Sequence, residues 1–466
     1  MSIITAPMNR SKDNETIAAL ATASGVAGIS VIRISGPDSL AVADKVFYCA
    51  GLKPSQRPTH TLVVGRVMAG HEFIDEALLL IMRAPRSYTR EDVVEIHCHG
   101  GLPTSRRVLR CVLEAGARPA DPGEFTCRAF LHGRIDLVQA EAVNDLIRAQ
   151  SDRSAQAALE QLEGRLSRRF NEAYDALIGL AADMEATLDF PDDELPPPVI
   201  TDVLRRIDGV TGDLRSLIAT WDDGHSLRDG LQVVIVGRPN VGKSTLMNAL
   251  LGRNRAIVSE VPGTTRDTIE ENFILDGIQL VLVDTAGLRD PQCSIEREGI
   301  SRTRRQMEKA DLYLYVVDAS QPRHPDDEKN MNELSNDNCI IVGNKTDLGR
   351  KFSIPSKFKK YYCETSIVYN IGMEDIIKKI SNIIENKFML GQNSRTIISE
   401  RHRKILVKAS EQLEQAHALL QNGLEESYVL VAGHLREAAE LMGLVTGKKY
   451  NDSLLESIFS NFCIGK

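Results

Sequence analysis

The first 130 residues alternate short apolar runs with turn-forming residues. The runs are rich in β-branched side chains and are bounded by Gly, Pro, Ser or Asp, a pattern typical of β-strands. A helix is expected after the last run. The sequence therefore predicts an α+β domain with strands at Gly28–Ser35, His60–Met68, Ala77–Met82 and Val93–His97, and a helix at Ser105–Glu114.

The pattern becomes helical from about residue 136. Ala, Leu, Glu, Arg and Gln dominate up to about Asp189, and apolar residues from Leu137 to Ile147 recur at helical spacing. Helical composition returns at Asp202–Ala219 and again at Ser399–Met442. These stretches predict a helical domain built from two separated segments of the sequence.

Between the helical segments, residues 231–388 alternate short apolar strands with helical stretches, as parallel α/β sheets do. Asp276-Gly277 joins the apolar runs Asn272–Leu275 and Ile278–Val283, which indicates one antiparallel hairpin. The chain is long enough for about three domains. The expected fold is multidomain, with an N-terminal domain at 1–133, a discontinuous helical domain at 134–228 and 389–466, and an inserted α/β domain at 229–388.

Composition narrows the class of protein. Apolar residues make up 42% and charged residues 26% of the 466 residues, as in ordinary globular proteins. The net charge of −8 disfavours unaided binding of nucleic acid, whose affinity comes from neutralised phosphates. The eight cysteines form no Cys-x-x-Cys pair, and no apolar run approaches the roughly 18 residues of a membrane span. We therefore expect a cytoplasmic protein with no zinc site, disulfide framework or membrane segment.

Residues 237–244 match a phosphate-binding loop. The apolar strand Val233–Val236 leads into Gly-Arg-Pro-Asn-Val-Gly-Lys-Ser and then into an apolar helix. The backbone amides of such a loop close around a β-phosphate, Lys243 neutralises phosphate oxygens, and the Ser244 hydroxyl is placed to bind Mg²⁺. This motif alone would serve ATP as well as GTP.

Three further motifs select a guanine nucleotide. Gly263–Asp267 offers Thr265 as a second Mg²⁺ ligand, and Asp284–Gly287 offers a carboxylate near that ion. In Asn344-Lys345-Thr346-Asp347, the Asp347 carboxylate can accept from both donors on the guanine edge, whereas adenine would leave it unpaired. The predicted GTP-binding residues are Asn240, Val241, Gly242, Lys243, Ser244, Thr245, Ser259, Glu260, Val261, Pro262, Gly263, Thr264, Thr265, Asp284, Thr285, Ala286, Gly287, Asn344, Lys345 and Asp347.

Two positions depart from the usual GTPase pattern. Leu288 stands where many GTPases place a glutamine that orients the attacking water, so either hydrolysis is slow or another polar group enters the site. The fifth motif, Ser-Ala-Lys or Ser-Ala-Arg, is degraded to Ser366-Ile367-Val368. Packing of the base on that side is therefore in question, although backbone contacts can persist.

With these motifs, the chain resembles the MnmE (TrmE) family of tRNA-modification GTPases. Members combine an Asn in the phosphate loop with Gly-Thr-Thr-Arg-Asp, Asp-Thr-Ala-Gly-Leu-Arg and a terminal Cys-x-Gly-Lys. The same features stand here at Asn240, Gly263–Asp267, Asp284–Arg289 and Cys463–Lys466. The resemblance runs from about Asp13 to the last residue.

The resemblance implies how GTP is hydrolysed without the glutamine. A bound K⁺ does the work of an arginine finger and stabilises the developing charge. Glu296 matches the family's water-orienting glutamate, and the residues alone leave open a solvated charge at the start of a helix at Ile295–Met307. The implied metal ligands are Ser244 and Thr265 for Mg²⁺, and Asn240, Ser259, Val261 and Thr264 for K⁺.

A second centre is expected in the N-terminal domain. Glu95 interrupts an apolar strand, and His97 and His99 follow it without the ligand cluster that a metal site needs. The resemblance implies a folate-binding fold here, with an Arg at position 134 where many members have Lys. The implied ligands of a tetrahydrofolate derivative are Arg33, Glu95, Arg134 and Lys466.

The C-terminal Cys463 is implied to be a catalytic thiol near that folate. The residues alone also allow a prenylation signal or a buried structural cysteine. Cys463 and Lys466 lie far in sequence from Arg33. They can join its pocket only if the helical domain folds back, or if a second subunit supplies them.

The resemblance finally implies a reaction and its partners. The partner is MnmG (GidA), a flavoprotein that carries FAD, in a heterotetramer with a homodimer of this chain joined through its N-terminal domains. Together they add an aminomethyl or carboxymethylaminomethyl group to carbon 5 of the tRNA wobble uridine. A methylene-tetrahydrofolate supplies the one-carbon unit, and ammonium or glycine supplies the amine. A ribosome-assembly GTPase or a switch GTPase, both without folate chemistry, are the alternatives.

Overall fold

The structure is a computed structural model that describes residues 14–189, 200–254, 270–284, 310–333, 338–389, 398–421 and 428–466. As far as they are described, the residues form two compact units. The first comprises Met1–Asn144, Leu162–Val210 and Lys408–Lys466, and the second comprises Asp145–Gln161 and Thr211–Val407. The N-terminal domain lies in the first unit and the α/β domain in the second, and helices contribute to both. The predicted multidomain fold class is confirmed.

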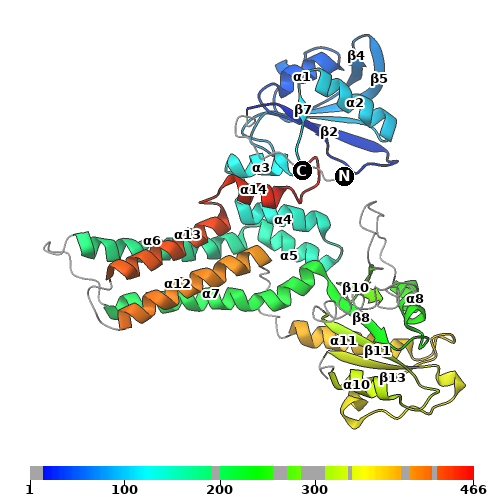
Figure 1. The fold of residues 1–466 in the computed structure, drawn as a ribbon. Coiled ribbons are helices and arrows are strands. Elements are labelled where there is room, and N and C mark those ends of the chain that lie inside the picture. The colour runs from blue at the N-terminus through cyan, green and yellow to red at the C-terminus, as the bar shows by residue number, and fades with distance from the viewer. Residues whose placement is uncertain are drawn as a thin grey trace, which may run out of the picture. The chain divides into compact units, whose positions relative to one another are not determined.

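A seven-stranded sheet organises the N-terminal domain (Figure 1). The strand order is β3-β4-β5-β6-β2-β1-β7, and only the short β1–β7 pair is parallel. The predicted strands are confirmed, with Ala77–Met82 forming the second half of a longer strand. The strands are β1 (Ile17–Leu20), β2 (Ile29–Ser35), β3 (Phe47–Tyr48), β4 (Thr61–Ala69), β5 (Glu72–Met82), β6 (Val93–His99) and β7 (Arg118–Pro119), with a 3-10 turn, η2 (Pro54–Gln56), before β4.

Helices α1 (Ser39–Val46) and α2 (Leu102–Glu114) cover one face of this sheet. Ile32, Leu79 and Ile96 are fully buried in the resulting core. The predicted helix at 105–114 is confirmed but begins three residues earlier, because Pro103 is tolerated in the first turn of a helix, where its missing amide costs no hydrogen bond.

The opposite face of the sheet is covered at one edge and exposed at the other. Next to β1 it is covered by α3 (Glu124–Leu131), whose Phe125 packs against Ile17 and Ala19. On β4, Leu62 and Val64 remain 57% and 61% exposed. The strand register places Leu62 in one cross-strand row with Leu80, Glu95 and Arg33, so polar and apolar side chains share this face.

The helical segments are confirmed on both sides of the insertion. They comprise α4 (Leu137–Arg148), α5 (Asp152–Leu162), α6 (Arg165–Asp189), α7 (Ile200–Asp229), α12 (Glu400–Gln421), α13 (Tyr428–Thr446) and α14 (Asp452–Phe459). Helix α13 packs along α6, from the other segment, through small buried residues such as Ala439 and Gly443. In the part of the chain that the structure describes, no helix has both the length and the apolar character to cross a bilayer.

The α/β domain contains a six-stranded sheet of order β13-β12-β11-β8-β10-β9 (Figure 1). All its neighbouring strands are parallel except β9 and β10. The predicted hairpin is confirmed, with Asp276 and Gly277 at positive φ in its turn. The strands are β8 (Leu231–Gly237), β9 (Glu270–Leu275), β10 (Ile278–Asp284), β11 (Leu312–Asp318), β12 (Cys339–Asn344) and β13 (Tyr362–Glu364).

Separate cores lie on the two faces of this sheet. Helices α8 (Lys243–Asn254) and α11 (Met373–Met389) pack on one face, around Leu246 and Ile376. Helix α10 (Pro325–Glu333) packs on the other, where Met331 meets Tyr315. Two 3-10 turns, η4 (Thr346–Leu348) and η5 (Ser356–Tyr361), follow β12. The carboxyl ends of the parallel strands therefore carry the motifs that the sequence assigns to the nucleotide.

Candidate functional site

The phosphate-binding loop joins β8 to the first turn of α8, as predicted. Lys243 is the first residue of α8, and its buried Nζ donates to the Arg238 carbonyl at 2.8 Å. Ser244 and Thr245 are exposed in the same turn. The N-terminus of a helix, with an ammonium group nearby, is suited to bind phosphate.

Asn344, at the end of β12, ties this loop to the base-selecting motifs. Its Nδ2 donates to the Val241 carbonyl at 2.9 Å, and its Oδ1 accepts from the Ile367 amide at 3.2 Å. Gly242 has a φ of +104°, and a Cβ there would lie 2.3 Å from Asn344 Nδ2. Asn344 therefore holds together two parts of the site that lie about a hundred residues apart in the sequence.

Lys345 contributes a second link to the loop. Its Nζ donates to the Asn240 carbonyl at 2.8 Å and to Asp318 Oδ2 at 2.8 Å. Burial alone would raise the pKa of the Asp318 carboxyl, but hydrogen bonds from Lys345 and Ser320 outweigh burial and lower that pKa. The carboxylate thus stays ionised at neutral pH and fixes Lys345 against the loop.

The degraded fifth motif contacts Asp347, the residue predicted to select guanine. Ser366 Oγ donates to Asp347 Oδ1 at 2.5 Å, and the neighbouring Ile367 amide is bound to Asn344. Val368, which stands where other GTPases have a basic residue, is 81% exposed. The motif therefore contacts both Asn344 and Asp347, although its usual basic side chain is absent.

Part of the predicted nucleotide site lies outside the described residues. The predicted residues outside these ranges are Ser259, Glu260, Val261, Pro262, Gly263, Thr264, Thr265, Thr285, Ala286, Gly287 and the catalytic candidate Glu296. Asp284 is described as the last residue of β10, next to β8 in the sheet. The structure therefore brings together the loop 237–244 with Asn344, Lys345 and Asp347, and these form the described half of the site.

The N-terminal polar centre is built on adjacent strands. Arg33 on β2 and Glu95 on β6 are direct cross-strand partners, and Arg33 Nε donates to Glu95 Oε1 at 2.8 Å. The second Glu95 oxygen lies 3.3 Å from His97 Nε2. His99 instead pairs with Asp75, with its Nδ1 2.8 Å from Asp75 Oδ1. The two histidines thus bind different carboxylates.

Aromatic rings surround the Arg33 guanidinium. Its Cζ lies 5.3 Å from the Tyr88 ring centroid and 5.7 Å from that of Phe125, and Arg134 Cζ lies 4.7 Å from the Tyr88 ring. The Nη1 of Arg33 is buried and has no hydrogen-bond partner within the described ranges. A buried donor without an acceptor is costly, so a bound acceptor would stabilise this arrangement.

The C-terminal tail of the same chain reaches this centre. The Gly123 amide donates to the Cys463 carbonyl at 3.4 Å, and Gly465 contacts the backbone of Leu20. Burial and then the Arg33 charge lower the pKa of the Lys466 amine, against the opposite effect of Glu95. The helical domain folds back, which was one of the two predicted alternatives, and it brings Lys466 to Arg33 and Glu95. The Cys463 side chain is exposed.

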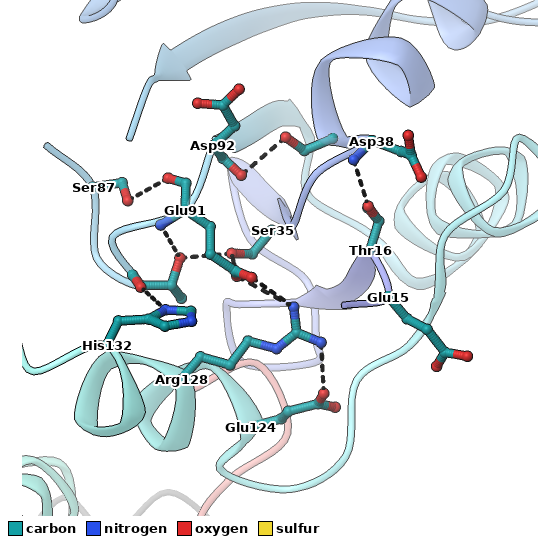
Figure 2. Close-up of polar contacts among 12 residues, drawn as sticks. Glu15, Thr16, Ser35, Asp38, Ser87, Glu91, Asp92, Glu124, Arg128 and His132 are labelled. Atoms are coloured by element: carbon teal, nitrogen blue, oxygen red, sulfur yellow. Dashed lines mark hydrogen bonds and ion pairs between the residues drawn. The ribbon is translucent and has the colours of Figure 1, made fainter. Parts of the chain in front are cut away.

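A buried ion-pair network supports the centre from α3. Figure 2 shows the Arg128 guanidinium between the Glu91 and Glu124 carboxylates, at 3.1 and 3.0 Å. The Arg128 side chain is only 3% exposed. Glu91 also accepts from Ser35 Oγ at 2.6 Å, and Glu124 accepts from Arg118 at 2.6 Å. The network fixes the loop that carries Tyr88 and the start of α3, where the C-terminal tail binds.

Sequence reasoning missed Tyr88, Phe125 and this network. A charged residue inside the apolar run Phe125–Phe130, four positions after Glu124, was the available signal for Arg128. Tyr88 has no such signal, because its neighbours in the centre come from distant strands. Of the predicted residues, Arg33 and Arg134 lie over the Tyr88 ring, and Glu95 and Lys466 lie near Arg33.

Comparisons with known proteins show the family to which the chain is related. A family model described as 'GTP-binding protein TrmE N-terminus' matches residues 16–134, and one described as 'MnmE helical domain' matches residues 137–463. A protein of Moorella thermoacetica named tRNA modification GTPase MnmE is 43% identical, covering 97% of this chain and 100% of the relative. A protein of Alkaliphilus metalliredigens with the same name is 40% identical, covering 97% of this chain and 99% of the relative.

The phosphate loop, the parallel sheet and the Asn-Lys-x-Asp motif define the chain as a P-loop GTPase. The two family models, and relatives that align with nearly all of this chain, identify its family among the P-loop GTPases. The chain belongs to the MnmE family of tRNA modification GTPases.

The fifth motif can be tested by Ser366→Ala. Loss of the hydrogen bond to Asp347 leaves the guanine-selecting carboxylate less well oriented, and we expect GTP affinity to fall by roughly fivefold, about 1 kcal/mol. Val368→Ala, in the same loop but exposed, should leave affinity unchanged. Titration with a fluorescent GTP analogue measures both. Equal affinities for the two variants would show that Ser366 does not support base recognition.

Proposed function

We propose that this GTPase modifies carbon 5 of the wobble uridine in certain tRNAs, together with the flavin-dependent partner MnmG. The product carries an aminomethyl or carboxymethylaminomethyl group, and the one-carbon unit comes from a methylene-tetrahydrofolate. The reaction takes place in the cytoplasm. Relatives that align with nearly all of this chain bear the name tRNA modification GTPase, which supports tRNA as the substrate.

The folate assignment rests on the unsatisfied Arg33. Its buried Nη1 has no acceptor among the described residues, while Glu95 beside it can accept from ligand N–H groups. A reduced folate offers ring acceptors and donors at one end and carboxylates at the other. Lys466 and Arg134 supply further positive charge, and the Tyr88 and Phe125 rings line the centre. Folate would bring the one-carbon unit, and this chain's residues would bind and orient it.

Cys463 is assigned the role of a reactive thiol at this centre. Its exposed side chain lies three residues before Lys466, and its carbonyl is bound to α3 through Gly123. The tail therefore presents the thiol beside the residues that would hold folate. An exposed thiol in such a position is accessible to a one-carbon unit, whereas the buried cysteines of this domain are not.

GTP hydrolysis is assigned to the α/β domain. Ser244 and Thr265 would bind Mg²⁺, Asp284 would lie near that ion, and Glu296 would orient the attacking water. A K⁺ ion held by Asn240, Ser259, Val261 and Thr264 would stabilise charge between the β- and γ-phosphates. The left-handed backbone of Asn240 (φ 62°) and its exposed position in the loop support a role for its side chain in binding an ion.

Assembly is proposed to occur through the N-terminal domains. The open part of the sheet exposes Leu62, Val64 and Ile29, of which Ile29 is 56% exposed. A second copy of this chain would cover this apolar surface and place two polar centres in one dimer. MnmG would join this dimer in a heterotetramer and, given the net charge of −8, would hold most of the tRNA.

The K⁺ dependence of GTP hydrolysis is testable because Leu288 stands where many GTPases have a glutamine, and the proposed K⁺ would do the work of an arginine finger. Hydrolysis should be at least about tenfold faster in K⁺ than in Na⁺ at equal ionic strength. Asn240→Ala should remove the difference while the protein still binds GDP. Phosphate release measured in both salts decides the matter. Equal rates for the wild-type protein would refute a catalytic K⁺.

The folate-dependent reaction is testable by deleting residues 463–466. The truncated protein should lose tRNA modification because Cys463 and Lys466 are gone, yet keep its dimer and its GTP hydrolysis. Nucleoside analysis of tRNA, light scattering and a GTPase assay measure the three properties. Modification that persists after truncation would remove Cys463 and Lys466 from the chemistry.

A further inference from the structure

A buried carboxylate outside the nucleotide motifs holds the phosphate loop from behind. Arg238 is the second residue of the loop, and its Nε donates to Asp327 Oδ2 at 2.9 Å. Asp327 lies in the first turn of α10 and is only 2% exposed. Asp327 belongs to none of the nucleotide-binding motifs. It lies 89 positions after Arg238 in the sequence but contacts Arg238 directly.

Asp327 is itself firmly fixed. Its Oδ1 accepts from the Tyr315 hydroxyl at 3.0 Å, and Asn330 Nδ2 lies 3.4 Å from the same hydroxyl. Burial, and then the nearby Asp327 charge, raise the pKa of Tyr315, so its phenol remains a donor at any physiological pH. Both carboxylate oxygens thus have partners, one in the central sheet and one in the loop.

The contact bears on the geometry of the loop. The Arg238 carbonyl accepts from Lys243 Nζ at 2.8 Å, and two residues further on the Asn240 carbonyl accepts from Lys345 Nζ at 2.8 Å. Arg238 is therefore held through its side chain at one end of the loop, and Asn240 through its backbone in the middle. Phosphate binding needs several amides aimed at one point, and fixing them beforehand lowers the entropy cost of binding.

We propose that Asp327 is a positioning residue of the nucleotide site, which acts on the phosphate loop through Arg238. It does not touch the nucleotide. Its carboxylate keeps the Arg238 side chain on α10 and thereby sets the backbone of the loop before GTP or GDP binds. The competing explanation is that the Arg238 side chain contacts the phosphates directly. In that case, neutralising Asp327 would release Arg238 and would strengthen nucleotide binding instead of weakening it.

The test measures the affinity of the full-length protein for fluorescent GDP and GTP analogues. Asp327→Asn removes the charge that holds Arg238, and affinity should fall by roughly tenfold or more. Arg238→Gln should cause a similar loss, and the double variant no more than either single one, because all three break one contact. Glu328→Gln is the matched control, since it removes a charge from the same turn of α10 but from a residue paired with Arg323.

The double variant leaves no unpaired charge in the core. A loss of nucleotide affinity in this variant is therefore not caused by misfolding around such a charge. Steady-state hydrolysis adds an independent readout: KM should rise while kcat at saturating GTP stays near the wild-type value. Arg238→Lys, which keeps the charge, should recover part of the affinity. The proposal is overturned if Asp327→Asn binds nucleotide as tightly as Glu328→Gln, or if only Arg238→Gln weakens binding, which would place Arg238 on the nucleotide itself.

Discussion

Attachment of the C-terminal tail to the N-terminal domain is the constraint on which the second centre depends. Lys466 and Arg33 lie at opposite ends of the sequence, and the tail meets the β1 end through backbone contact. Gly465 has a φ of +98°, and a Cβ there would lie 2.3 Å from the Leu20 carbonyl oxygen. Backbone atoms cannot move aside as side chains do, so the position requires glycine. Steric exclusion thus fixes the position of Gly465 against the end of β1.

The support for this attachment is electrostatic as well as steric. Phe459 and Phe462 pack against Gly123 at the start of α3. That start is held by Glu124, which binds both Arg118 and Arg128. Burial alone would raise the pKa of Glu124, but hydrogen bonding to Arg118 and the further contacts lower that pKa, so the network stays charged. One buried set of charges therefore positions the tail and the Tyr88 loop together, and any change in it would reach both sides of the centre.

Local patterns in the sequence were sufficient for the fold class but not for the full sites. The strand at 93–97, the Asp276-Gly277 turn and the loop 237–244 could be predicted because periodicity and turn chemistry act over a few residues. The contacts of Arg128 and the pairing of Asp327 with Arg238 could not, because they join elements whose distance in space depends on the packing of helices on sheets. Arg33 and Glu95 were found through family resemblance, and their direct pairing follows from a strand register that composition does not encode.

Completion of the N-terminal centre by the C-terminal tail can be tested by comparing Gly465→Val with Ile464→Val. Gly465 is tightly enclosed, whereas Ile464 is 62% exposed, so only the first change conflicts with the Leu20 backbone. Calorimetry measures binding of a stable tetrahydrofolate derivative to each full-length variant, with GTP hydrolysis as the check on folding. We expect Gly465→Val to lose at least about tenfold in folate affinity and to hydrolyse GTP normally, while Ile464→Val behaves as wild type. Unchanged folate affinity in Gly465→Val would contradict it.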